Sequence, residues 1–237
     1  SHLYVSKRAA AMLGKPADQC NLITMHIGSG ASGVAIKNGR AVDTTLGMTP
    51  TAGLVMGTRP GDVDAAAMLY VMEQLKLTPE QMTKHLNKDS GLMGITQCFA
   101  DRRDVEANKD ENPLCKLAID MEVHTVKKYI GAFMAELGHT DAIVFTAGVG
   151  ENDDFLREKF CEGLEELGVK LDVEANRNAL ARKGVDEAVI STPDSKVKVM
   201  MIATNEELVI VEDTIAIMNG TYNANHLKMN YSFAKQR

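Results

Sequence analysis

The alternation of apolar and polar residues is most regular near the start of the chain, where it predicts three strands. The segments 21–28 (NLITMHIG) and 32–39 (SGVAIKNG) alternate as half-buried strands do. Asn38 and Gly39 are a strong two-residue hairpin-turn signal, and residues 40–47 (RAVDTTLG) follow as the third strand. We therefore expect an antiparallel run of three strands.

A helical period, framed by capping residues, describes most of the remaining chain. The longest predicted helix covers residues 113–137; Asn112 caps it and Gly138 ends it. One apolar stripe runs along it and favours burial in a core. The stripe consists of Val126, Tyr129, Ile130, Phe133 and Leu137. The other predicted helices cover 3–13, a segment from about Val63 capped by Asp62, a segment from Pro79 with Thr78 and Gln81 as a capping box, a segment from Asn152 or Asp153 through Leu167, 174–184, and 206–218 capped by Asn205.

Short apolar runs predict three more strands. They lie at the start of 141–152 (DAIVFTAGVGEN), at 188–192 (AVIST) and at 197–204 (VKVMMIAT). Antiparallel strands combined with helix-flanked strands predict an α/β layer fold. The polar segment from Thr221 to the chain end is expected to be loose.

Composition narrows the class of protein. The 237 residues suffice for one large domain or two small ones. A net charge of −6 argues against nucleic acid as the main partner, and no apolar run reaches membrane-spanning length. Basic residues within the first predicted helix argue against a signal peptide. The cysteines have no metal-site or redox spacing, so we expect buried thiols in a reducing compartment, with the cytoplasm as the default. They are Cys20, Cys98, Cys115 and Cys161.

Two glycine-rich segments follow apolar strands. In the first, GSGAS at 28–32, glycines allow close approach to the main chain, and N–H groups together with Ser29 and Ser32 could bind an anion. A glycine-rich hairpin bulge is the alternative. The second, AGVGEN at 147–152, is predicted as a turn between a buried strand and a capped helix. Open α/β sheets bind ligands at such positions.

Charged residues near glycines supply further candidates. Arg59 lies between Gly57 and Gly61, and its planar guanidinium suits carboxylate or phosphoryl oxygens; a solvated surface arginine is the alternative. The cluster DRRD at 101–104 is expected on a loop, either as a second basic site or as a charged surface loop. Glu206 begins a helix, where it either complements the helix dipole or binds Mg²⁺.

Several segments together resemble one family. They are SHLYVSKRAA, the hairpin with its continuation HIGSGASGVAIKNGRAVDTTLGMTPTAGLVMGTRPGDVD, FTAGVGEN and TNEEL. In this order they resemble the acetokinase family, within the superfamily of acetate and sugar kinases, heat-shock ATPases and actin. The resemblance covers almost all of residues 1–218. It implies an RNase H-like, actin-like ATPase domain: an α/β fold whose mixed sheet is flanked by helices.

The resemblance also implies site residues. Arg59 would stabilise the transferring phosphoryl group, Pro50 would line the small acyl pocket, and Glu206 would bind Mg²⁺, with Mn²⁺ as a possible substitute. The implied nucleotide-binding residues are His26, Ile27, Gly28, Ser29 and Gly30, then Asp101, Arg102 and Arg103, then Gly148, Val149, Gly150, Glu151 and Asn152. Three departures stand out. Ser29 replaces an asparagine usual in the family, and the segment TQCFADRRD is slightly longer than its counterpart. The largest is at the start, where the chain opens with SHLYV: the first histidine of the family's motif is missing, and His2 matches the second.

The implied reaction is Mg²⁺-dependent phosphoryl transfer between ATP and acetate, giving acetyl phosphate and ADP, in acetyl-CoA biosynthesis. Propionate or butyrate kinase and a catalytically incomplete nucleotide-binding fragment are the alternatives; a pure interaction domain has no need of Arg59, Glu206 and both glycine segments. The resemblance places residues 1–206 in a nucleotide-binding lobe and expects 207–237 to pack on an N-terminal lobe that this sequence lacks. A cytoplasmic homodimer is expected for the complete protein, without nucleic-acid or membrane partners, and this chain alone is expected to be inactive.

Overall fold

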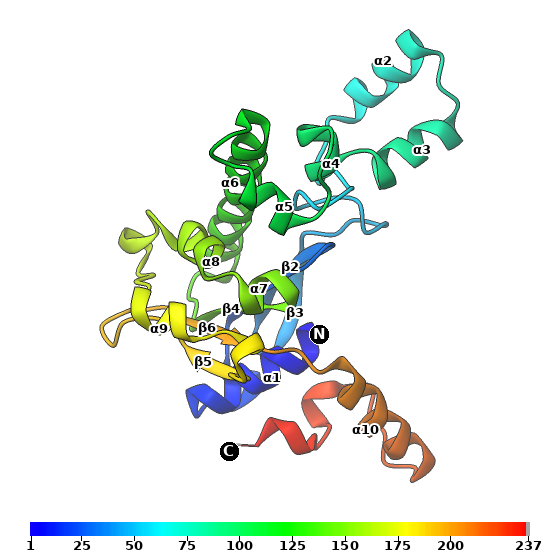
Figure 1. Ribbon diagram of the computed structural model, residues 1–237. Helices are drawn as coiled ribbons and strands as arrows, with labels where there is room; N and C mark the ends of the chain where they lie inside the picture. The colour runs from blue at the N-terminus through cyan, green and yellow to red at the C-terminus, as the bar shows by residue number, and fades with distance from the viewer. Residues whose placement is uncertain (236–237) are drawn as a thin grey trace. The chain divides into compact units, whose positions relative to one another are not determined.

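A six-stranded mixed sheet forms the centre of the fold in the computed structural model, which describes residues 1–235 (Figure 1). The strand order is β3-β2-β1-β4-β6-β5. β1 pairs parallel with β4, β4 pairs parallel with β6, and β5 pairs antiparallel with β6. The strands are β1 (Leu22–Ile27), β2 (Ala31–Lys37), β3 (Arg40–Thr44), β4 (Ala142–Thr146), β5 (Glu187–Val189) and β6 (Lys198–Ile202). The predicted α/β class with a mixed, helix-flanked sheet is confirmed.

The helices follow the predicted pattern with some differences. They are α1 (His2–Leu13), α2 (Ala65–Leu75), α3 (Pro79–Lys88), α4 (Gly91–Thr96), α5 (Arg102–Ala107), α6 (Pro113–Leu137), α7 (Ala147–Asn152), α8 (Asp154–Cys161), α9 (Val173–Asn178) and α10 (Glu206–Met218), with short 3₁₀ turns η1 (Ala17–Gln19), η2 (Glu165–Leu167), η3 (Ala181–Lys183), η4 (His226–Lys228) and η5 (Ser232–Ala234). The Thr78–Gln81 capping box and the Asn205 cap are confirmed. The N-cap of α2 is Asp64, so the prediction of Asp62 is wrong.

The chain divides into two compact units. The first contains residues 1–26, residues 34–43 and everything described from Gly131 onward. The second contains residues 27–33 and 44–130. Each unit holds part of the predicted site, so the two are described separately below.

The core of the first unit lies between α1 and one face of the sheet. Side chains alternate along β4, so Ala142 and Val144 join the α1 cluster. On the same strand Phe145 stacks on Phe160 of α8, with ring centroids 5.8 Å apart. α1 ends at Gly14, whose φ of 65° is the left-handed conformation that closes a helix.

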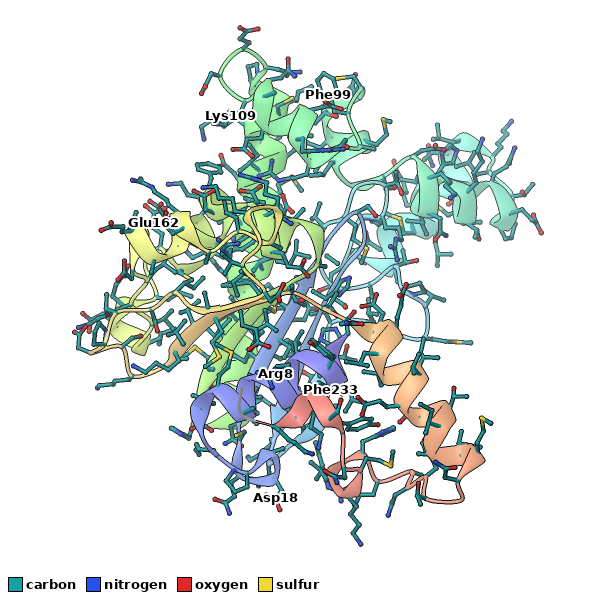
Figure 2. All side chains as sticks on the ribbon, turned by 60° about the horizontal axis from the view of Figure 1, so that its bottom comes forward. Arg8, Asp18, Phe99, Lys109, Glu162 and Phe233 are labelled. Carbon is teal, nitrogen blue, oxygen red and sulfur yellow. The ribbon has the colours of Figure 1, made fainter. Side chains whose placement is uncertain are left out.

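The C-terminal segment is packed, contrary to the prediction that it is loose. Tyr231 and Phe233 are buried, and their rings stack in the α1 cluster with centroids 4.8 Å apart. Arg8 donates to the carbonyls of Phe233 and Lys235, and Figure 2 shows Arg8 and Phe233 side by side. Local composition missed this packing because the two aromatic residues are separated from α1 by most of the chain.

Two further expectations concern exposure and membranes. Three cysteines are buried as expected, but Cys98 is exposed, so the prediction of a buried thiol is wrong there. Along residues 1–235, no helix combines the length and apolar character needed to cross a membrane.

Candidate functional site

In the first unit, predicted site residues meet at the carboxyl edge of three parallel strands. His26 on β1 is in register with Thr146 on β4, and Thr204 and Glu206 follow the end of β6. Since parallel strands present their carboxyl ends at one edge, the fold brings these residues together although they are far apart in sequence. This is the edge at which open α/β sheets bind ligands.

Glu151 ties two of these strand ends together. Its Oε1 accepts hydrogen bonds from the Ala147 N–H (2.7 Å), the Thr146 hydroxyl (3.2 Å) and the Thr204 N–H (3.0 Å). One carboxylate oxygen therefore joins the ends of β4 and β6. This structural role accompanies the predicted contact with nucleotide, which stays a prediction.

The segment 147–152 is a short helix, α7, and the predicted glycine turn is wrong. Ala147 absorbs the change of direction with a φ of 67°, and the Glu151 carboxylate bonded to its N–H stabilises that conformation. A Cβ on Gly150 would lie 3.3 Å from the Phe145 carbonyl carbon, so this glycine lets α7 approach β4. A Cβ on Gly148 would meet nothing within 4 Å, which leaves its main chain open to a ligand.

A fully buried arginine, Arg157, anchors α7 from behind. Its guanidinium donates to the carbonyl of Gly150 (2.9 Å), to Asn176 Oδ1 (2.7 Å) and to the carbonyls of Asn176 and Ala179. Burial lowers the pKa of Arg157 to about 10, so it remains charged at neutral pH. Sequence reasoning missed Arg157 because nothing local distinguishes it from a surface arginine on an amphipathic helix.

Asn152 is held by another arginine. Its side-chain oxygen accepts from the Arg182 N–H (2.7 Å), and its carbonyl accepts from the Arg182 side chain (2.6 Å). Together with the Arg157 contact to Gly150, this fixes the second half of the glycine segment from the protein side. Val149, which precedes Gly150, is half-buried.

Two histidines near this edge are neutral at physiological pH. Burial and the neighbouring His26 lower the pKa of His2 to about 4, and His2 Nδ1 lies 2.7 Å from the Thr24 hydroxyl. Burial also lowers the pKa of His26, although the carboxylates of Glu206 and Glu151 act in the opposite direction. A neutral His26 can donate one hydrogen bond to an anion and accept another.

Glu206 is the predicted metal ligand at this edge. The backbone N–H at the start of α10 and the Thr204 hydroxyl (2.9 Å) lower its pKa, so its exposed carboxylate is ionised. Over the described residues, no group of three or more His, Cys, Asp or Glu side chains could hold a metal ion. A single carboxylate fits Mg²⁺, which is commonly held by one or two carboxylates with phosphate oxygens and water.

In the second unit, three predicted residues meet around the Arg59 guanidinium. The guanidinium donates to the Pro50 carbonyl, and a Cβ on Gly30 would lie 2.3 Å from Nη2. The absence of a side chain at Gly30 therefore lets the guanidinium lie directly against the glycine main chain in this position. The structure brings Gly30, Arg59 and Pro50 together; their phosphate, phosphoryl and acyl roles stay predictions.

The loop that carries Arg59 is pinned at its ends. The Gly53 N–H donates to Asp62 Oδ1 (2.9 Å), and the Asp62 N–H donates back to the Gly53 carbonyl (3.0 Å). This explains why Asp62 does not cap α2. Further along, the Gly57 N–H donates to the Ser29 carbonyl (3.0 Å), which joins the loop to the first glycine segment.

The short helix α4 holds the middle of the same loop. The N–H groups of Ser90, Leu92 and Met93 donate to the carbonyls of Thr58, Met56 and Gly57 over 2.9–3.1 Å. Gly91 makes this contact possible: its φ is 61°, and a Cβ there would lie 2.1 Å from the Met56 carbonyl oxygen and 2.6 Å from that of Arg59. α4 was not predicted, because a six-residue helix carries too little periodicity.

The predicted basic cluster begins helix α5 and does not lie on a loop. Asp101 caps α5 and also binds the Arg103 side chain at 2.6 Å, and this arginine lowers the pKa of Asp101 to about 2. Arg102 is buried and lies 2.6 Å from a carboxylate oxygen of Glu122 on α6. Arg103 thus faces solvent while Arg102 points inward; their nucleotide contacts stay predictions.

A cavity of about 730 Å³ adjoins Arg59 in the second unit. Its lining includes Ser29, Thr58, Lys84 and Lys88, the last two from α3. Three cations, counting Arg59, face one carboxylate, Glu80. The cavity is therefore suited to an anionic ligand.

The fold and the carboxyl-edge site define the class: a helix-flanked mixed sheet of the actin-like ATPase type. A family model described as the acetokinase family matches residues 1–212, and the chain belongs to that family. It is 55% identical over 237 residues to an acetate kinase of Trichlorobacter lovleyi, covering 99% of this chain and 55% of that protein. The chain thus spans about half the length of this relative.

Solved structures agree with this assignment. The crystal structure of Porphyromonas gingivalis acetate kinase superposes with a TM-score of 0.87 at 44% identity, covering 92% of this chain and 54% of that chain. A propionate kinase from Francisella tularensis superposes with a TM-score of 0.80 at 38% identity, covering 89% and 52% respectively.

Proposed function

We propose that this chain carries the nucleotide-binding and phosphoryl-transfer residues of an acetate kinase, which transfers the γ-phosphoryl group of ATP to acetate and gives acetyl phosphate and ADP. The observation that carries the proposal is the meeting of Gly30, Arg59 and Pro50 in the second unit. A phosphate-binding turn, a guanidinium and an acyl-pocket residue are the parts that this reaction needs.

The chemistry follows from the side chains. Phosphoryl transfer depends on positioning and on neutralising charge at the transferring group. Arg59 is anchored by the Pro50 carbonyl, so its guanidinium is preorganised to stabilise charge on the phosphoryl oxygens. Gly30 places its main chain directly beside the Arg59 guanidinium, where the proposed phosphate turn and the arginine would meet the same phosphate group. Acetate is already ionised at neutral pH, so no strong general base is required.

Glu206 would hold Mg²⁺, with Mn²⁺ as a substitute. The ion, when bound, neutralises phosphate charge. The neutral His26 and the open main chain of Gly148 would contact the nucleotide at the same strand edge. These are the nucleotide and metal contacts proposed for the first unit; Gly28, Gly30 and Arg59 belong to the second.

One observation supports an acid other than acetate as the substrate. The similarity to a propionate kinase structure favours propionate, and by extension butyrate, as the alternative substrate. Position 50 is part of the proposed acyl pocket, and a pocket of different width selects a different acid. A catalytically incomplete nucleotide-binding chain is the other alternative.

We also propose where additional parts of the assembly contact this chain. Of the segment 207–237, α10 would pack on a further lobe, because it exposes Ile210, Val211 and Ile217, whereas Tyr231 and Phe233 already pack on α1. A homodimer would use α2, where none of the helix residues is buried and Leu69 is 68% exposed. Cytoplasmic location and a role in acetyl-CoA biosynthesis complete the proposal.

Substitution of Arg59 tests the proposed reaction. In the protein as its gene encodes it, Arg59→Ala should lower kcat for acyl phosphate formation by about 10²–10³-fold, with a small change in the KM for ATP. Arg177→Ala, an exposed arginine on α9, is the matched control and should leave both constants unchanged. The 237-residue chain should bind Mg²⁺–ADP by calorimetry. An unchanged kcat in Arg59→Ala would refute the assigned role.

A further inference from the structure

A second cavity, of about 330 Å³, lies within the first unit. It is bounded by α1, the β1–β2 strands and the η4 turn, and none of the predicted site residues lines it. Its lining includes Leu3, Lys7, Leu22, Ile36, Arg40 and Leu227. At about 30 Å³ per water, the volume equals about eleven waters, which is the size of a small organic molecule.

Lys7 is the unusual member of this lining. The residue is buried, with 6% of its surface exposed. Within residues 1–235 it makes no hydrogen bond and no ion pair. Burial lowers its pKa, and the more distant carboxylate of Asp18, labelled in Figure 2, acts against that effect. The Lys7 stem is therefore buried while its ammonium stays accessible, so the charge is available to an anion in the cavity that the residue lines.

The neighbouring Arg8 shows what a satisfied buried cation looks like in the same helix. Arg8 is 2% exposed, and its guanidinium binds both carboxylate oxygens of Glu187, at 2.5 Å and 2.8 Å. It also donates to two main-chain carbonyls. The chain therefore supplies every partner that Arg8 needs and none for Lys7, whose side chain lines the cavity instead.

The other residues that line the cavity indicate what kind of ligand would pair with Lys7. Arg40 adds a second cation, and no Asp or Glu lines the cavity. The walls contributed by Leu3, Leu22, Ile36 and Leu227 are aliphatic. We propose that this cavity is a binding site for an aliphatic monocarboxylate, with its carboxylate paired to Lys7 and Arg40 and its hydrocarbon chain against the aliphatic walls.

The proposal is tested with three probes of equal chain length: hexanoate, 1-hexanol and hexylamine. Binding to the 237-residue chain is followed by the shift in melting temperature and by calorimetry. Hexanoate should bind saturably and at least tenfold more tightly than hexanol, because a charge-assisted contact is worth at least a factor of ten. Hexylamine should not bind. Equal shifts for hexanoate and hexanol, or no shift with hexanoate, would overturn the proposal.

Variants assign the binding to this cavity. Lys7→Met keeps the length of the side chain and removes its charge, so it should weaken hexanoate binding at least tenfold without lowering the melting temperature of the free chain. Lys183→Met, an exposed lysine with no charged partner, is the matched control and should bind as the unaltered chain does. Unchanged binding in Lys7→Met would refute the site.

A second measurement does not depend on how Lys7→Met folds. In the unaltered chain, NMR should detect contacts between the hexanoate hydrocarbon protons and the methyl groups of Leu22 and Ile36. Arg40→Gln, at an exposed position, should weaken binding more mildly than Lys7→Met. Contacts to methyl groups elsewhere, or none at saturation, would show that the acid binds outside this cavity and would end the proposal.

Discussion

Substitution of Gly91 by alanine should disturb the loop that carries Arg59. A left-handed conformation costs a non-glycine residue about 1–2 kcal/mol. A Cβ at Gly91 would also lie 2.1 Å from the Met56 carbonyl oxygen, a main-chain atom that cannot move alone. The loop must therefore shift away from α4.

That shift breaks the bonds from Leu92 and Met93 to the loop carbonyls, both 2.9 Å long. At about 0.5–1.5 kcal/mol each, their loss adds about 1–3 kcal/mol. The total destabilisation expected for Gly91→Ala is thus about 2–5 kcal/mol.

Substitutions of two other glycines separate the conformational cost of Gly91→Ala from the cost of displacing the loop. Gly138 has a φ of 72° but open space around a Cβ, so Gly138→Ala should cost only the conformational part, about 1–2 kcal/mol. Gly131 lies within α6 with no positive φ and no neighbour within 4 Å, so Gly131→Ala should stabilise the chain by about 0.5–1 kcal/mol. Urea unfolding of the 237-residue chain, followed by circular dichroism, ranks the three variants.

A kinetic measurement links the same contact to Arg59. In the gene-encoded protein, Gly91→Ala should lower kcat, whereas Gly138→Ala should leave it unchanged. The reasoning is refuted if Gly91→Ala is no less stable than Gly138→Ala and keeps full kcat, since α4 then does not hold the arginine loop.

Two more predictions concern the strand edge. Glu151→Met should destabilise the chain by about 1–3 kcal/mol, because it leaves the Ala147 and Thr204 N–H groups without their acceptor. Glu151→Gln keeps an oxygen at this place and should cost less. Glu136→Met, on the exposed side of α6, is the control, and equal urea midpoints for all three variants would contradict the bridging role. His2 has a pKa of about 4 in the folded chain, against an ordinary value of 6.5. Between these pH values the unfolded chain binds a proton that the folded chain does not, so stability should fall by up to about 3 kcal/mol as the pH drops through this window. His2→Gln should flatten that part of the stability–pH curve, and a slope identical to that of the unaltered chain would exclude His2 as its source.

The sequence predicted elements whose signals are local. The Asn38–Gly39 hairpin, the Thr78 capping box and the bounds of α6 each depend on residues close together in the chain, and all are confirmed. The parallel order of β1, β4 and β6 then places the segments that follow these strands side by side, which the sequence did not predict.

Features that depend on distant contacts could not be predicted in the same way. AGVGEN is helical because Glu151 and the buried Arg157 hold it, and Arg157 finds its partners on α9. Tyr231 and Phe233 are buried against a helix at the opposite end of the sequence. Neither interaction leaves a periodic signal, since each requires the folded sheet to bring its partners together.

The contact between Arg59 and Pro50 makes the width of the side chain at position 50 independent of the anchoring of the arginine. Arg59 is anchored by the main-chain carbonyl of Pro50, and every amino acid has that carbonyl. The side chain at position 50 can therefore change width without removing the arginine's acceptor. In the proposed acyl pocket, substitutions at position 50 would change the preferred acid and leave the acceptor for the arginine in place, so one loop would serve enzymes that act on acids of different chain length.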